Sequence, residues 1–209
     1  MRELFVRGGP VMWPLVLLSV ASVTITIERV IFWCCAARRK AHAAVEAILR
    51  LTERGNFEGA ADAGRKTSDF SAAVLVSGLE NREHGLSEAM QVAAEEEIAR
   101  MRRGLNVLDT VVTLAPLLGI LGTVLGIIES FDLLGAGGIE DPKAVTGGIA
   151  QALLTTAAGL SIAILTLIPL NYFAARVQKA TKHLESLATR FEVAYRKGAE
   201  QKNASHQRI

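Results

Sequence analysis

The sequence predicts an all-α integral membrane protein with three transmembrane helices that extend into a cytoplasmic helical bundle, and it does not predict a soluble enzyme. Half of the 209 residues are hydrophobic, yet 21% are charged, so the two classes must be segregated along the chain. A transmembrane helix needs about 20 apolar residues. Apolar runs of this length occupy residues 11–33, 105–131 and 146–173.

The charges between these runs predict how the chain crosses the membrane. Residues 34–104 contain eleven Lys or Arg residues, and the positive-inside rule assigns such a segment to the cytoplasm. The connection 132–145 carries one Lys against three acidic residues, so we expect it to face the periplasm, as does the N-terminal segment 1–10. Residues 174–209 are again basic and are expected in the cytoplasm as a C-terminal helix and tail.

The cytoplasmic segments have a helical pattern interrupted by glycines. Turn signals stand at Gly55 and Gly64, and residues 70–105 predict a helix or helix pair broken around Gly85. The third apolar helix is expected to continue to Tyr195. From Gly198 onward the sequence predicts a frayed end.

Small residues recur at spacings of three and four in the second and third apolar runs. Such residues let helix backbones approach closely in lipid, where association depends on packing. Both helices are therefore predicted to pack against other helices, in several copies of the chain. The small residues are Ala115, Gly119, Gly122 and Gly126 in the second run, and Gly148, Ala152, Thr156, Gly159 and Ala163 in the third.

Polar residues share one face of the second helix and define a candidate ion pathway. Asp109, Thr113, Pro116 and Thr123 lie at helical spacing along this face. From their depth in the two runs, Thr123 and Thr156 are expected at one level in the membrane. The alternative is that each threonine only bonds the carbonyl four residues earlier in its own helix, as membrane threonines commonly do.

Gln151 and the missing central acid complete this candidate pathway. A primary amide in hydrocarbon needs hydrogen-bond partners, and Thr155, one turn on, is a candidate partner for Gln151. The acids near the runs, Glu28, Asp109 and Glu129, all lie toward the ends. If the protein conducts protons, the central carboxylate must therefore come from a partner protein.

Several other functions have no support in the sequence. There is no phosphate-binding glycine loop, no histidine cluster and no arrangement of nucleophile and base. No nucleic-acid motif is present. Cys34 and Cys35 are adjacent on a predicted helix and cannot readily bridge each other. We therefore expect no catalytic residues, no metal site, no cofactor and no nucleic-acid partner.

Three segments resemble the ExbB/TolQ/MotA proton-channel family over nearly the whole chain. They are GGPVMWPLVLLSV near the start, APLLGILGTVLGIIESF in the second run and GGIAQALLTTAAGLSIAI in the third. Few other families pair the second and third motifs. The presence of three apolar runs places the likeness with the ExbB and TolQ branch.

The resemblance implies a homopentamer in the bacterial inner membrane that surrounds the helices of an ExbD-like or TolR-like single-span partner. In the family the membrane aspartate of that partner carries the proton. The motifs place the family's two pore threonines on Thr123 and Thr156. The energised partner then acts on a TonB-like protein for import across the outer membrane, or on a TolA-like protein for envelope constriction.

The sequence departs from the family pattern at two places. The glutamate that is common at the head of the third span is Gln151 here, so an acid sometimes assigned to the pathway is missing. The frequent A-I-P stretch is Ala163-Ile164-Leu165, with Pro169 further on. The alternatives to an ExbB-like role are a TolQ-like subunit, a gliding-motility stator and a membrane scaffold that conducts no ions.

Overall fold

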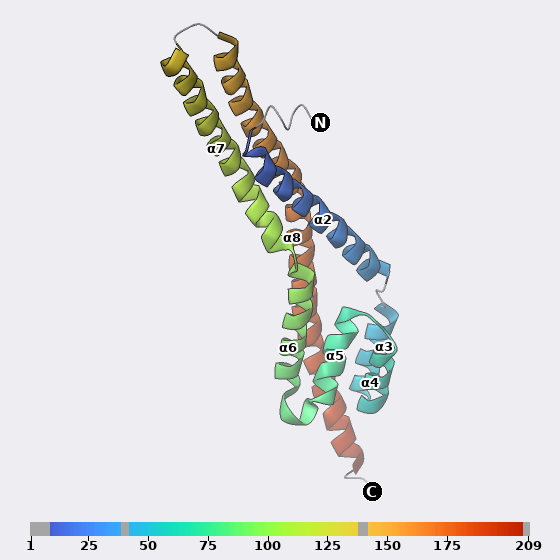
Figure 1. Cartoon of the computed structure of the whole chain (residues 1–209). Helices are drawn as coiled ribbons and strands as arrows, with labels where there is room; N and C mark the ends of the chain where they lie inside the picture. Colours follow the sequence, from blue (N-terminus) through green and yellow to red (C-terminus); the bar gives the residue numbers. More distant parts are fainter. Residues whose placement is uncertain (1–8, 39–41, 138–141, 207–209) are drawn as a thin grey trace. The chain divides into compact units, whose positions relative to one another are not determined.

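The structure is a computed structural model of the chain and describes residues 9–38, 42–137 and 142–206 (Figure 1). Every regular element in these residues is an α-helix, which confirms the predicted all-α class. Helices long and apolar enough to cross a membrane fall within Met12–Arg38, Arg82–Asp132 and Thr146–Lys202. The chain is therefore a multi-pass membrane protein by the length and composition of its helices.

The helices divide into two compact units. The first unit comprises the residues up to Arg29 together with Gly104–Phe173. The second comprises Val30–Arg103 together with the residues from Ala174 onward.

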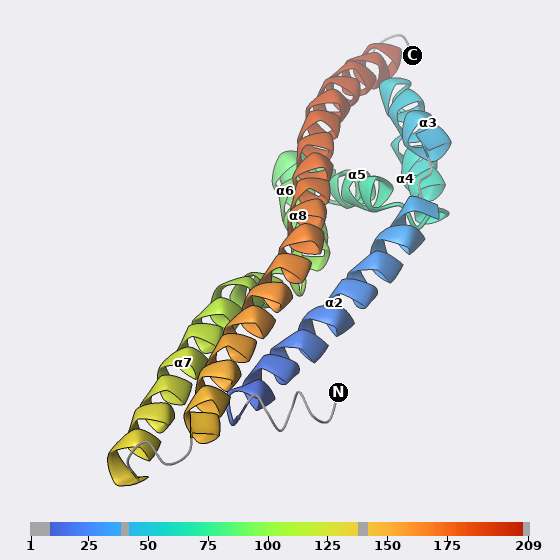
Figure 2. The ribbon, with the colours of Figure 1, turned by 90° about the horizontal axis from the view of Figure 1, so that it is seen from above.

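The first unit contains three apolar helices, α2 (Met12–Arg38), α7 (Leu105–Gly137) and α8 (Pro142–His206). Here α7 and α8 run side by side, as the two views show (Figures 1 and 2). Large apolar side chains such as Leu17, Phe131 and Leu165 are exposed on this unit, as expected for helices whose solvent is hydrocarbon rather than water. The buried cluster is small and comprises Val11, Met12, Leu15, Ala115 and Ala163.

Among the described side chains of this unit, one charged side chain is buried. Arg29 of α2 is only 2% exposed, and its Nε and Nη2 atoms donate to the two carboxylate oxygens of Glu28. A paired guanidinium is tolerated in an apolar surrounding where a lone one is not.

The second unit contains the helices that lie between α2 and α7 in the chain, and two of them begin with a side-chain cap. They are α3 (His42–Glu53), α4 (Phe57–Arg65), α5 (Phe70–Glu80) and α6 (Arg82–Arg102). Asn56 caps α4 by accepting the N–H of Gly59 at 3.0 Å, and Asp69 caps α5 by accepting the N–H of Ser71 at 2.7 Å. The helical pattern breaks at Gly85, as predicted, because its φ of 149° is non-helical.

The core of the second unit forms where α8 packs against these helices. Leu184, Leu187, Phe191 and Ala194 of α8 join the buried side chains of α3, α4, α5 and α6. Exposed polar contacts at the edge of this core also join α8 to α3 and α6. Arg190 pairs with Glu46 of α3 at 3.2 Å, and Ser87 of α6 donates to Glu192 at 2.7 Å.

The C-terminal end of α8 corrects the expectation of a frayed tail. The helix continues through Gly198 to His206. Gly198 is buried, and a Cβ at this position would collide with the carbonyl oxygen of Thr52 and lie 3.1 Å from the N atom of Gly55. The glycine therefore permits close packing of α8 on the end of α3, although glycine in isolation favours the end of a helix.

Candidate functional site

Small residues bring the backbones of α7 and α8 into contact in the first unit. A Cβ at Gly119 would lie 3.0 Å from the Cα of Thr156, and a Cβ at Gly126 would lie 2.9 Å from the carbonyl oxygen of Gly148. A Cβ at Gly159 would lie 3.2 Å from the Cα of Gly119. All five glycines that the sequence predicts for helix packing stand at this contact, the fifth being Gly122.

The close approach brings the hydroxyls of Thr123 and Thr156 together. Their Oγ1 atoms are in direct hydrogen-bond contact. Thr156 Oγ1 also lies 2.9 Å from the carbonyl oxygen of Gly119, across the helix interface. Thr123 Oγ1 lies 3.1 Å from the same carbonyl, four residues earlier in its own helix. Both threonines are half-buried, so the structure places them at one level of the helix pair.

The two hydroxyls have only two hydrogens to donate between them. Each hydroxyl has one hydrogen to donate and two lone pairs to accept with. When one hydroxyl donates to the carbonyl oxygen of Gly119, the other hydroxyl can donate to the oxygen of the first. Thr123 therefore does bond the carbonyl four residues earlier in its own helix, but this is only part of its bonding. Thr156 does not follow this alternative, because the carbonyl that it contacts lies on the other helix.

Thr155 also belongs to this helix interface, although the sequence pattern of small residues does not include it. It is 1% exposed, its hydroxyl donates to the carbonyl of Ala152 at 2.8 Å, and its side chain fills the space beside Gly122. The signal that identifies it is its spacing, since the buried positions of α8 from Gly148 to Ala163 are Gly148, Ala152, Thr155, Gly159 and Ala163.

Gln151 is not held by Thr155, contrary to the suggested pairing. Its side chain is half-buried, and its amide occupies the space where a Cβ at Gly9 would stand. Gly9 has a φ of 66°, a conformation that glycine adopts without strain. The amide therefore packs against the turn that precedes α2, while the Thr155 hydroxyl bonds within α8.

The remaining predicted pathway residues stand apart from the hydroxyl pair. Thr113 is exposed and donates to the carbonyl of Asp109 at 3.1 Å. Asp109 is exposed, and Pro116 is half-buried within α7. Ile120, on the same face, is 55% exposed. Most of this face of α7 is therefore exposed in the single chain between Asp109 and Thr123, with Pro116 partly covered.

Acidic groups are distant along the helix from the hydroxyl pair. Among the described side chains of α7, the acids are Asp109, Glu129 and Asp132. Glu129 is six residues beyond Thr123, about 9 Å along the axis. No group of three or more His, Cys, Asp and Glu residues that could hold a metal ion occurs in the described part of the chain. The site offers hydroxyls and a carbonyl, and it lacks a carboxylate of its own.

Comparison with known proteins identifies relatives along most of the chain. Residues 66–186 match the model of the MotA/TolQ/ExbB proton channel family. ExbB-like protein 1 of Synechocystis is 34% identical over 206 residues, covering 92% of this chain and 78% of the relative. ExbB-like protein 3 of the same organism is 32% identical and covers 91% and 92%. The Tol-Pal system protein TolQ of Pseudomonas aeruginosa is 36% identical over 108 residues, covering 52% and 47%.

Proposed function

The chain belongs to the MotA/TolQ/ExbB proton channel family, and we propose that it is the ExbB-like channel subunit of an inner-membrane motor driven by the proton-motive force. One observation carries this proposal. Two hydroxyls from different membrane helices, Thr123 and Thr156, meet in a half-buried position at a glycine-lined contact. Hydroxyl groups at such a position suit a proton path, because each can donate and accept a hydrogen bond.

The acid that carries the proton is supplied by a partner. We propose an ExbD-like or TolR-like protein with one transmembrane helix and one membrane aspartate. An ionised aspartate would accept a hydrogen bond from Thr123 or Thr156, and a protonated one would donate to their lone pairs. The same pair of hydroxyls therefore serves both protonation states. Neutralising the partner acid frees its helix to move to the next subunit.

The assembly that follows from this role is a homopentamer around the partner helices. The mostly exposed face of α7, which carries Asp109, Thr113 and Pro116, suits contact with other helices, and Gln151 lies at the head of the third span. In this assembly residues 34–104 and 174–209 lie in the cytoplasm and the N-terminus in the periplasm. The energised partner acts on a TonB-like protein, or on a TolA-like protein in a TolQ-like role.

Proton entry into liposomes tests the role of the hydroxyl pair. The chain would be reconstituted with its single-span partner, and internal pH followed with a fluorescent dye under an imposed proton gradient. Thr123→Val and Thr156→Val together keep the side-chain shape and remove both hydroxyls, so proton entry should fall to the background of empty liposomes. Thr155→Val is the matched control and should conduct, because its hydroxyl bonds only within α8.

Two results would count against the proposal. Undiminished proton entry in the double valine variant would remove the hydroxyl pair from the pathway. A wild-type complex that assembles with its partner yet conducts no protons would favour the scaffold alternative.

A further inference from the structure

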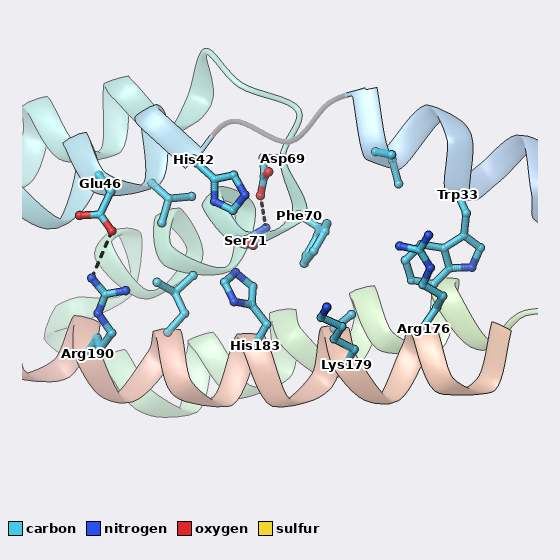
Figure 3. Close-up of a pocket in the computed structure, with 15 residues that line it drawn as sticks. Trp33, His42, Glu46, Asp69, Phe70, Ser71, Arg176, Lys179, His183 and Arg190 are labelled. Carbon is cyan, nitrogen blue, oxygen red and sulfur yellow. Dashed lines mark hydrogen bonds and ion pairs between the residues drawn. The ribbon is translucent and has the colours of Figure 1, made fainter. Parts of the chain in front are cut away.

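A cavity of about 390 Å³ lies in the second unit, separate from the hydroxyl pair. Its walls come from the end of α2, the start of α3, the start of α5 and one face of α8 (Figure 3). Trp33 and Phe70 are its aromatic walls. The polar lining of the α8 side consists of Arg176, Lys179, His183 and Arg190.

The α8 wall is basic because its charged residues recur on one helical face. Arg176, Lys179 and His183 are separated by three and four residues, which brings them to the same side of the helix. Figure 3 shows Lys179 and His183 extending from α8 toward the space between α8 and the opposite wall. The opposite wall contributes a further imidazole, His42.

The acids that line the cavity have partners within the unit. Glu46 pairs with Arg190 at 3.2 Å, and Asp69 accepts the N–H of Ser71 at 2.7 Å as the cap of α5. Lys179 and His183 make no hydrogen bond or ion pair with another residue in the described ranges. Three cationic side chains face two carboxylates around the cavity, so the lining has one positive charge in excess.

We propose that this cavity binds a phosphate ester, with Lys179 and Arg176 as the cationic contacts and His183 as a further donor. Lys and Arg side chains hold phosphate oxygens by charge-assisted hydrogen bonds. The aromatic walls accommodate the organic part of the ester. This site is independent of proton conduction, because none of its residues lies near Thr123 or Thr156 in the sequence or in the same unit.

The position of the cavity along the chain favours a phospholipid headgroup as the source of the phosphate. Trp33 ends the first apolar run, and Arg176 follows the third run by three residues. Tryptophan and basic residues at the ends of membrane helices lie at the headgroup level, and basic pockets there bind lipid headgroups. A soluble phosphate ester would have the same chemistry and is distinguished by experiment.

Trp33 supplies a direct reporter of binding, since the chain has only one other tryptophan, Trp13. The full chain carrying Trp13→Phe would be purified in dodecyl maltoside, and Trp33 fluorescence followed during titration with dioleoylphosphatidylglycerol. Dioleoylglycerol has the same acyl chains without phosphate and is the lipid control. Glycerol 3-phosphate in solution tests the soluble source.

We expect a saturable change with phosphatidylglycerol and none with dioleoylglycerol. Lys179→Gln and Arg176→Gln should each weaken binding about fivefold, the loss expected for one cation beside an anionic lipid surface. Lys182→Gln is the matched control, because Lys182 is exposed on α8 and does not line the cavity. Its affinity should equal that of the parent.

The possible outcomes distinguish a phospholipid from a soluble ester, and they also test the proposal itself. Saturation by glycerol 3-phosphate without saturation by phosphatidylglycerol would assign the site to a soluble ester. Binding of neither phosphate compound would overturn the proposal, as would an equal loss of affinity in Lys179→Gln and Lys182→Gln. Circular dichroism and gel filtration of each variant verify the fold, and no result here depends on proton conduction.

Discussion

Gly122 of α7 lies directly against the side chain of Thr155 of α8. A Cβ at Gly122 would stand 2.7 Å from the Cβ of Thr155 and still closer to its hydroxyl oxygen. Real Cβ atoms do not approach so closely, so the spacing of α7 and α8 requires glycine at this position. The same spacing keeps the hydroxyls of Thr123 and Thr156 in contact, each one residue further along its helix.

Gly122→Ala should therefore separate α7 from α8. Rotation of the Thr155 side chain cannot relieve the collision, because the Cβ of Thr155 is itself too close. Overpacking of this kind costs about 1–3 kcal/mol. We expect a corresponding fall in the free energy of unfolding, measured in mixed micelles of dodecyl maltoside and sodium dodecyl sulfate, together with reduced proton entry in liposomes.

Two further variants test that explanation. Gly147→Ala places the same methyl group on α8 where no atom lies within 4 Å of the new Cβ, so packing should be unaffected. Thr155→Gly combined with Gly122→Ala removes the colliding side chain and should recover part of the lost stability. If Gly147→Ala lowered the free energy of unfolding as much as Gly122→Ala, the collision with Thr155 would not be the cause of the loss.

Cysteines at 123 and 156 should form a disulfide within one chain. The two native cysteines would first be replaced, as Cys34→Ala and Cys35→Ala, since both are free and exposed. Because the hydroxyl oxygens of Thr123 and Thr156 touch, sulfur atoms in their place lie within reach of each other. After mild oxidation, neither thiol should react with a maleimide of high mass, and a reductant should restore both reactions.

The matched control moves one cysteine along the same face of α7. Thr113→Cys with Thr156→Cys moves the α7 thiol ten residues away from position 123, about 15 Å along the helix axis. Both thiols should therefore stay reactive toward the maleimide within a monomer. Equal protection of the two pairs would contradict the register of α7 and α8.

Local sequence patterns were enough to predict the three apolar helices, and they single out the glycines and the two threonines that the structure brings to the contact between α7 and α8. These features depend on helical periodicity and hydropathy, which are properties of short segments. The roles of Thr155 and Gly198 depend on which segment packs opposite them. Thr155 is buried against Gly122, and Gly198 lies within the continuing helix against the end of α3. Periodicity places Thr155 on the packing face of α8, but it does not show that Gly122 lies opposite Thr155 or that α3 ends beside Gly198.

Thr156→Ser should preserve proton entry where Thr156→Val reduces it. Serine keeps the hydroxyl that contacts Thr123 and the Gly119 carbonyl. Loss of one hydrogen bond between membrane helices costs only about 0.6 kcal/mol, so Thr156→Val should fold and differ mainly in conduction. Parallel measurement of proton entry and of unfolding separates the two effects. A serine variant as inactive as the valine variant would indicate that the threonine methyl group, and not the hydroxyl, is required.

Gly198→Ala should destabilise the second unit even though alanine favours helices. Glycine to alanine within a helix ordinarily gains about 1 kcal/mol, but here the new Cβ would collide with the carbonyl oxygen of Thr52. That atom belongs to the backbone of α3 and cannot rotate away, so an overpacking cost of about 1–3 kcal/mol should outweigh the gain. Thermal unfolding followed by circular dichroism should show a lower Tm for Gly198→Ala than for the parent. Gly147→Ala, on the same helix with no atom in its way, should give an equal or higher Tm. A rise in Tm for both variants would mean that the end of α8 does not pack on α3.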